Sequence, residues 1–315
     1  MKNSNSTENT NIADISARIE ELKKKHNAVL IAHNYQIGEV QEVADFVGDS
    51  LELSQKAAQI EAEIIVFCGV HFMAETAAIL SPEKTVLLPE KDAGCPMADM
   101  ITAPDMREWK KRYPGRNVVC YVNTTAAVKA ECDICCTSAN AVEVVESLDG
   151  DEILFAPDKN LAAYVARYTD KKIIPWDGYC YVHNNIHVKD IEEKRRLYPD
   201  AEVWVHPECR PEVIDIADKV FSTGKMVKEA RETEKNKIIL GTEAGMTYRL
   251  KKENPDKEFY PAKDLAFCFN MKKIDLNKVL KSLEDLKYKV EVPPKISQKA
   301  LGSITKMIQI KGVEK

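Results

Sequence analysis

Short runs of aliphatic and β-branched residues recur along the chain, separated by segments in which apolar positions have a helical spacing. Runs of this kind between helices indicate an α/β protein with buried parallel strands. Between the first two runs, one helical face carries Val40, Val43, Ala44 and Val47, which predicts a helix over 39–48. Nine runs predict nine strands, at 28–32, 64–68, 85–89, 118–122, 152–156, 172–176, 202–205, 237–241 and 258–261.

The predicted strands fall into three groups that resemble one another. Each group has a strand end, a polar residue, a short helix, a small hydroxyl residue and a second helix, and it finishes in a loop cysteine. These cysteines are Cys95, Cys180 and Cys268, separated by 85 and 88 residues. A fixed period of this size indicates a repeated structural unit. We therefore expect an α/β fold of three similar three-layer α/β/α domains around a pseudo-threefold axis, each with a small parallel sheet.

The repeat also predicts where the domains begin and end. The N-terminal residues are polar, and we expect a disordered lead-in there. The C-terminal part has one amphipathic helix followed by a short stretch that we expect to add an edge strand, and it should pack on the first repeat. The expected divisions are 1–12 (lead-in), 13–98 (repeat 1), 99–183 (repeat 2), 184–271 (repeat 3) and 272–315 (C-terminal helical extension).

Composition and charge exclude several classes of function. The 315 residues include 45 basic and 50 acidic residues, closely mixed, for a net charge of −5. This balance predicts neither a nucleic-acid surface nor a charged interaction arm. The longest apolar runs are too short to cross a bilayer, so we expect no membrane partner. The N-terminus lacks the apolar region of a secretory signal, and the expected location is cytoplasmic.

Nine cysteines in such a chain do not read as a disulfide framework, because the number is odd and the expected compartment is reducing. If the repeats surround an axis, the loops of Cys95, Cys180 and Cys268 meet there. Three thiolates suit zinc or an iron–sulfur cluster. A [4Fe-4S] cluster held by three cysteines leaves one iron for a substrate, whereas structural zinc normally takes a fourth protein ligand.

A second cysteine motif, "CDICC", contains Cys132, Cys135 and Cys136. A single CxxC pair can be a redox pair or half of a zinc site, and this one occurs in only one repeat. We place it in a connection between two helices and expect a structural or incidental role.

Polar side chains follow the first strand of each repeat, at the carboxyl edge where parallel sheets bind ligands. They are the candidates for proton transfer and substrate binding. Hydroxyl residues stand in equivalent places at the start of the second helix, the position of an N-cap. Three helix N-termini facing one cavity would bind about three anionic groups. The strand-end residues are His33, Tyr35, Tyr121, Asn123, His206 and Glu208, and the hydroxyl residues are Ser50, Ser138 and Thr223.

Many separate motifs of the chain resemble those of the quinolinate synthase family, the A protein of de novo NAD biosynthesis. The resemblance covers residues 15–310 and keeps the family's order. The motifs are "AHNYQ", "VADFVGDS", "FCGVHFMAETA", "AGCPMAD", "YVNTTAAVKA", "CCTSANA", "PDKNLA", "WDGYC", "VHPEC", "STGKM" and "GTEAGM".

The resemblance implies three α/β/α domains about a pseudo-threefold axis and a [4Fe-4S] cluster on Cys95, Cys180 and Cys268. It implies a condensing enzyme of transferase or lyase type that joins iminoaspartate to dihydroxyacetone phosphate, giving quinolinate, phosphate and water. An aspartate oxidase or aspartate dehydrogenase would supply the imine. The resemblance links Tyr35 to proton transfer, and we expect Tyr35, Glu208 and His206 to be the catalytic residues. It places the following residues around the substrate: His33, Ser50, Tyr121, Asn123, Ser138, His206, Glu208 and Thr223.

One departure separates the chain from part of that family. Some members carry a CxxCxxC run around the third ligand, but here Cys268 stands alone in "FCFNMKK". A disulfide switch at that place is therefore not expected, and whether Cys132 and Cys135 replace it stays open. Two other classes also stay open from the residues alone. One is a zinc-dependent lyase or hydrolase that uses the same thiolates, and the other is a redox sensor built on "CDICC".

Overall fold

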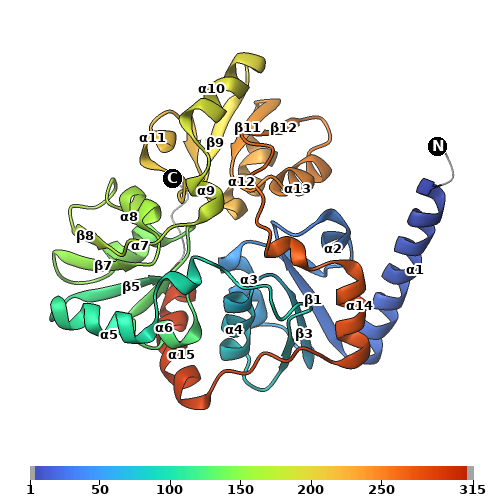
Figure 1. Ribbon diagram of the computed structural model, residues 1–315, viewed down its shortest axis with the longest axis horizontal. Coiled ribbons are helices and arrows are strands. Elements are labelled where there is room, and N and C mark those ends of the chain that lie inside the picture. Colours follow the sequence, from blue (N-terminus) through green and yellow to red (C-terminus); the bar gives the residue numbers. More distant parts are fainter. Residues whose placement is uncertain (1–3, 311–315) are drawn as a thin grey trace.

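The computed structural model describes residues 4–310 and contains three lobes grouped around a common centre (Figure 1). Each lobe has one four-stranded sheet whose strands are all parallel. Unit 1 contains α1 (Ser4–Lys25), β1 (Ala28–His33), α2 (Gly38–Glu42), β2 (Phe46–Gly48), α3 (Ser50–Ala57), β3 (Ile64–Cys68), α4 (His71–Leu80), β4 (Thr85–Leu87) and the 3₁₀ turn Ala98–Met100.

The other two units repeat this plan. Unit 2 contains α5 (Ala103–Arg112), β5 (Asn117–Tyr121), α6 (Ala126–Lys129), β6 (Ile134–Cys136), α7 (Ala141–Glu146), β7 (Glu152–Ala156), α8 (Lys159–Val165), β8 (Lys172–Pro175) and α9 (Tyr181–Asn184). Unit 3 contains α10 (Val188–Leu197), β9 (Glu202–Val205), α11 (Pro211–Ile214), β10 (Lys219–Val220), α12 (Thr223–Glu232), β11 (Lys237–Gly241), α13 (Met246–Glu253), β12 (Glu258–Pro261) and the 3₁₀ turn Met271–Lys273.

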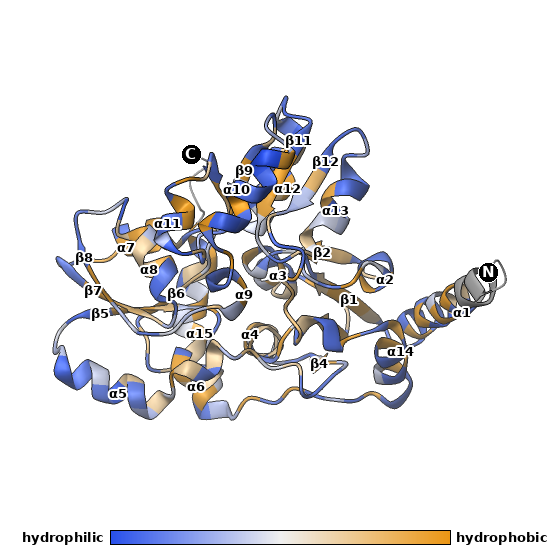
Figure 2. Cartoon of the chain, turned by 45° about the horizontal axis from the view of Figure 1, so that its top comes forward, coloured by the Kyte–Doolittle hydropathy of each residue, from blue (hydrophilic) through white to orange (hydrophobic). Residues whose placement is uncertain are grey.

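The three sheets share one topology, which confirms the expected fold class. Their strand orders are β2-β1-β3-β4, β6-β5-β7-β8 and β10-β9-β11-β12. The inner strands are buried on both faces, as parallel strands covered by helices must be. Figure 2 shows apolar residues gathered on the strands, whereas the outer helices α5 and α10 carry hydrophilic residues.

An aspartate repeats at the same place in each unit, just before the short edge strand. The carboxylate of Asp45 accepts from the backbone N–H of Leu30 at 2.8 Å, and the equivalent bonds join Asp133 to Val118 at 2.8 Å and Asp218 to Val203 at 2.7 Å. In all three pairs the residues are 15 apart, and the aspartate N–H donates back to the same partner's carbonyl. This shared pair of hydrogen bonds supports the internal repeat independently of the strand order.

Three short strands were not predicted, and two sequence-based expectations were wrong because of them. The expected helix over 39–48 ends at Glu42, since Phe46–Gly48 must be extended to pair with β1. Likewise "CDICC" is not a connection between helices: Ile134–Cys136 is strand β6, and Cys135 pairs with Cys120. All nine cysteines are free thiols.

The chain ends pack on this core. Residues 1–3 of the expected lead-in lie outside the described residues, and residues 4–12 form part of α1. Helix α14 (Leu276–Asp285) packs on α1 and β3 of unit 1, as expected. No strand forms at the expected edge-strand position, where the chain makes only an isolated antiparallel bridge between Lys289 and Leu87. Helix α15 (Pro294–Gln309) differs from expectation, because it packs on unit 2 at α6 and β6 as well as on α4.

No helix within residues 4–310 is long and apolar enough to cross a membrane.

Candidate functional site

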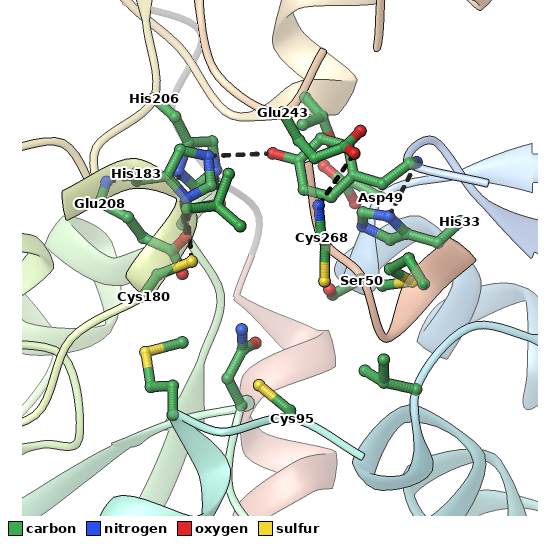
Figure 3. A pocket seen from close by; sticks show the side chains of 18 of the residues that line it. His33, Asp49, Ser50, Cys95, Cys180, His183, His206, Glu208, Glu243 and Cys268 are labelled. Carbon is green, nitrogen blue, oxygen red and sulfur yellow. Dashed lines mark hydrogen bonds and ion pairs between the residues drawn. The ribbon is translucent and has the colours of Figure 1, made fainter. Parts of the chain in front are cut away.

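A pocket lies at the centre of the three units, where the carboxyl ends of the first strands meet (Figure 3). It contains about 660 Å³ of empty space, part of it open to solvent. All twelve predicted site residues line this pocket: His33, Tyr35, Ser50, Cys95, Tyr121, Asn123, Ser138, Cys180, His206, Glu208, Thr223 and Cys268. The structure therefore brings the sequence candidates together, although it does not test their roles.

The three loop cysteines enter the pocket from three separate loops (Figure 3). Burial raises the pKa of all three thiols, to about 12 for Cys95, and nearby negative charge adds to this, from Cys268 for Cys95, from Glu208 for Cys180 and from Glu243 for Cys268. Each sulfur also accepts a backbone N–H from the residue three positions later, at Ala98, His183 or Met271.

These contacts suit cysteines that bind a metal. N–H groups directed at sulfur favour the thiolate, the form in which cysteine binds metals, and hydrogen bonds to sulfur also tune iron–sulfur clusters. Two buried oxygens in the same pocket, Asn123 Oδ1 and Glu208 Oε1, have no hydrogen-bond partner among the described residues. Unpartnered buried oxygens are rare in proteins, and in a pocket they are typical of groups with a catalytic or binding role.

A tight group of side chains lies on one wall of the pocket. His183 Nδ1 is 2.6 Å from Glu208 Oε2 and 3.3 Å from Cys180 Sγ. Burial opposes ionisation of Glu208, but the charge of His183, its hydrogen bond and the charge of His206 bring the carboxyl pKa down to about 2. Glu208 is therefore a carboxylate at neutral pH. The donor atoms of Cys180, His183 and Glu208 lie within 4.8 Å of one another and could hold a metal ion.

Two imidazoles occupy equivalent places in units 1 and 3. The backbone N–H of Tyr35 donates to His33 Nδ1 at 3.1 Å, and that of Glu208 donates to His206 Nδ1 at 3.3 Å. Each neutral ring therefore carries its proton on Nε2. Burial lowers both pKa values to about 3, with the positive charge of Lys272 adding to this for His33 and that of His183 for His206. His206 is thus a neutral hydrogen-bond donor, and its Nε2 lies 3.2 Å from Ser138 Oγ.

The hydroxyl residues lie at the helix starts, but they are not the caps that the sequence suggested. Asp49 caps α3 and Ser222 caps α12, so Ser50 and Thr223 are the first helical residues. Ser138 lies outside its helix, two residues before Asn140, which is the N-cap residue of α7. An N-cap side chain turns back to its own helix, whereas Ser50 and Thr223 remain available to the pocket.

Asp49 joins the starts of two helices. Its carboxylate accepts from the N–H groups of Leu51 and Glu52, each at 2.9 Å, and from Gly224 at the start of α12. Residue 224 must be small, because a Cβ there would lie 2.5 Å from Asp49 Oδ2. Burial, followed by the charge of Glu52, raises the pKa of Asp49 to about 6.

We expect Asp49→Asn to change the pH dependence of stability. The folded protein holds the Asp49 proton more tightly than the unfolded chain, so this stabilisation is present below pH 3.8 and is lost as the pH rises through about 6. The shift corresponds to about 3 kcal/mol, and asparagine keeps the capping acceptor. Denaturant unfolding of the wild type and of Asp49→Asn between pH 4 and 8 measures this pH-dependent part of the stability. A difference between them that does not vary with pH would contradict the assignment.

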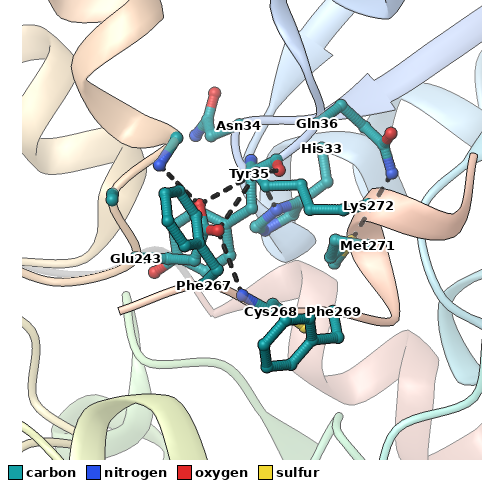
Figure 4. A network of polar contacts seen from close by, with 12 residues as sticks. His33, Asn34, Tyr35, Gln36, Glu243, Phe267, Cys268, Phe269, Met271 and Lys272 are labelled. Atoms are coloured by element: carbon teal, nitrogen blue, oxygen red, sulfur yellow. Dashed lines mark hydrogen bonds and ion pairs between the residues drawn. The ribbon is translucent and has the colours of Figure 1, made fainter. Parts of the chain in front are cut away.

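A second buried carboxylate ties the loop of Cys268 to that of Tyr35 (Figure 4). Glu243 is 1% exposed and accepts from the N–H of Cys268 at 3.1 Å and of Gly245 at 2.8 Å. Lys272 pairs with Glu243 Oε1 at 3.0 Å and also donates to the carbonyl of Tyr35. One ion pair thus holds both loops.

Replacing Glu243 with glutamine should loosen the Cys268 loop. The variant leaves the Lys272 charge without its partner, and we expect a loss of about 1–3 kcal/mol in unfolding free energy. Denaturant unfolding of the variant and the wild type measures this loss. Glu234→Gln is the matched control, since Glu234 is exposed in the loop before β11. Equal free energies of unfolding in the two variants would show that the ion pair does not hold the loop.

Comparisons with known proteins agree with this architecture. The family described as "Quinolinate synthetase A protein" matches residues 17–309. The chain belongs to the quinolinate synthase family. A protein named quinolinate synthase from Dehalococcoides mccartyi (strain 195) is 60% identical over 296 residues, which cover 94% of this chain and 98% of that protein. "Quinolinate synthase 2" of Methanosarcina acetivorans is 52% identical, covering 95% and 96%, and the quinolinate synthase of Thermodesulfovibrio yellowstonii is 53% identical, covering 92% and 96%.

Sequence reasoning missed several polar residues of the site of this quinolinate synthase family member. Asp49 and Glu243 line the pocket, and Thr242 bonds to both Tyr35 and His183, with Oγ1 at 2.7 Å from the Tyr35 hydroxyl and 2.9 Å from His183 Nε2. A signal was present for two of them, because Thr242 and Glu243 directly follow the carboxyl end of β11.

Proposed function

We propose that this chain is a quinolinate synthase of NAD biosynthesis. It condenses iminoaspartate with dihydroxyacetone phosphate to give quinolinate, phosphate and two waters, with a [4Fe-4S] cluster on Cys95, Cys180 and Cys268. One observation carries the proposal: a single pocket gathers one loop cysteine from each unit together with a buried carboxylate. The high identity to proteins named quinolinate synthase supports it.

The pocket walls suit a substrate set with two carboxylates and a phosphate. The hydroxyls of Ser50 and Thr223, the first residues of α3 and α12, line the pocket and can donate hydrogen bonds to anionic groups. His33 and His206 add neutral N–H donors, which bind an anion without forming a salt bridge that would have to break on product release. Together these groups orient the two reactants side by side, which removes much of the entropic barrier to their condensation.

Proton transfers fall to Glu208 and Tyr35. Glu208 is ionised, so it accepts a proton from the substrate carbon that becomes the nucleophile. Burial raises the pKa of Tyr35, whose hydroxyl stays protonated and donates to a leaving oxygen. His206 holds its proton on Nε2, beside Ser138. It orients the substrate as a neutral hydrogen-bond donor and does not protonate it. When bound, the cluster supplies an iron without a protein ligand, a Lewis acid for a hydroxyl or carboxylate oxygen.

The reaction itself provides the test. The chain is purified without oxygen and mixed with dihydroxyacetone phosphate while an aspartate oxidase or aspartate dehydrogenase generates iminoaspartate. Quinolinate and phosphate should form in equal amounts, and neither should form when one substrate is omitted. Phosphate release that does not depend on iminoaspartate would indicate a hydrolase and would overturn the proposal.

A further inference from the structure

The wall that contains Cys180 has the donor set of a mononuclear metal site. Cys180 and His183 form a C-x-x-H pair at the start of α9, and Glu208 approaches from the loop after β9. Zinc bonds of 2.0–2.3 Å place tetrahedral ligands roughly 3.3–3.7 Å apart. His183 Nδ1 and Cys180 Sγ are already 3.3 Å apart, and all three donor atoms lie within 4.8 Å of one another.

The residues around this group support a metal ligand role for His183. Its Nε2 lies 2.9 Å from Thr242 Oγ1 and 3.3 Å from the Tyr35 hydroxyl. A hydroxyl can donate or accept, so the ring can move its proton to Nε2 and free Nδ1 for a metal without losing its partner. Metal-bound histidines almost always have such a partner on the other nitrogen.

The Glu208 carboxylate and the open side of the site also support metal binding. The side chain of Glu208 is 4% exposed, yet its Oε1 has no hydrogen-bond partner among the described residues. A bound cation would satisfy this buried oxygen. All three residues line the pocket, and three protein ligands leave the fourth coordination position open, which distinguishes such zinc sites from closed structural ones.

We propose that the cluster-free protein binds one zinc ion at Cys180, His183 and Glu208, and that zinc there excludes the iron–sulfur cluster. Binding releases the thiol proton of Cys180, and the resulting thiolate and the Glu208 carboxylate neutralise the two positive charges of the ion. The exclusion follows because both groups need Cys180. Only this second part rests on the proposed function, since zinc binding involves no cluster.

Zinc affinity of the cluster-free protein, measured by competition with a chromophoric chelator, tests the first part. Cys180→Ser, His183→Asn and Glu208→Gln should each weaken zinc binding by about 100-fold or more, given that loss of a group behind a ligand already costs 10–100-fold. Cys95→Ser and Cys268→Ser are matched controls that remove cluster ligands but leave the zinc affinity unchanged. With Co²⁺ in place of zinc, the thiolate-to-metal absorption band should disappear in Cys180→Ser and persist in Cys95→Ser.

Three results would overturn the inference. The wild-type protein could bind no stoichiometric zinc. Zinc affinity could fall equally in the Cys95, Cys180 and Cys268 variants, which would assign zinc to the three cysteines instead. Finally, zinc-loaded wild type could take up iron and sulfide as fast as zinc-free protein, which would refute the exclusion alone. Failure to form quinolinate would refute the proposed function without affecting the zinc titration.

Discussion

Serine in place of Cys268 is expected to abolish both iron binding and quinolinate formation. Cys268 lies on a loop whose backbone N–H groups, from Asn270 and Met271, point at its sulfur. Serine keeps the size of the side chain, but it offers no thiolate, so a cluster held by three cysteines loses a third of its protein bonds. We expect wild type to contain about four irons and the variant almost none, because soft thiolates select the iron–sulfur cluster. The same result is expected for Cys95→Ser and Cys180→Ser.

Cys132→Ser is the matched control for this experiment. Cys132 is also partly exposed, but it lies outside the pocket, where its sulfur donates to the carbonyl of Val128 at 3.1 Å. Iron and sulfide are counted after anaerobic reconstitution, and the visible spectrum is recorded. If Cys268→Ser bound as much iron as wild type, or if Cys132→Ser lost its iron, the ligand assignment would fall.

The fold was predictable because its inner strands are marked by composition. Runs such as 64–68 and 237–241 each contain three consecutive aliphatic residues, and the structure has strands at those positions. The edge strands β2, β6 and β10 escaped notice because each has only two or three residues. An aspartate precedes each of these strands, at Asp45, Asp133 and Asp218. A single aspartate does not predict a strand, however, until the partner strand is known.

The candidate site was predictable to the extent that the repeat defined it. Equivalent positions in three units converge on one centre, and this argument selected Cys95, Cys180 and Cys268 over the more conspicuous "CDICC". Residues without an equivalent in the other units escaped the same argument. His183 is the main example, because its contact with Glu208 joins units 2 and 3 and depends on how α9 packs.

The capping error has a similar physical origin. Serine and threonine are good N-caps, so Ser50 and Thr223 were natural choices. Their neighbours Asp49 and Ser222 take that role instead. A cap side chain must satisfy its own helix, and the pocket-lining hydroxyls of Ser50 and Thr223 lie one position later. Sequence alone places such pairs to within one residue, which is not enough to separate a cap from a binding group.

Glutamine in place of Glu208 should keep the cluster and lose turnover. The variant preserves the shape of the side chain and can still accept a hydrogen bond from His183, so iron content should match wild type. It cannot accept a substrate proton, and we expect kcat to fall by about 10²–10⁴-fold, the usual contribution of a general base. Because the Glu208 pKa is about 2, wild-type activity should show no loss from its protonation between pH 5 and 8. Glu212→Gln is the matched control, since Glu212 lies in the same unit with its side chain 55% exposed. Near-normal kcat in Glu208→Gln, with full iron content, would remove Glu208 from the chemistry and leave Tyr35 as the remaining candidate for proton transfer.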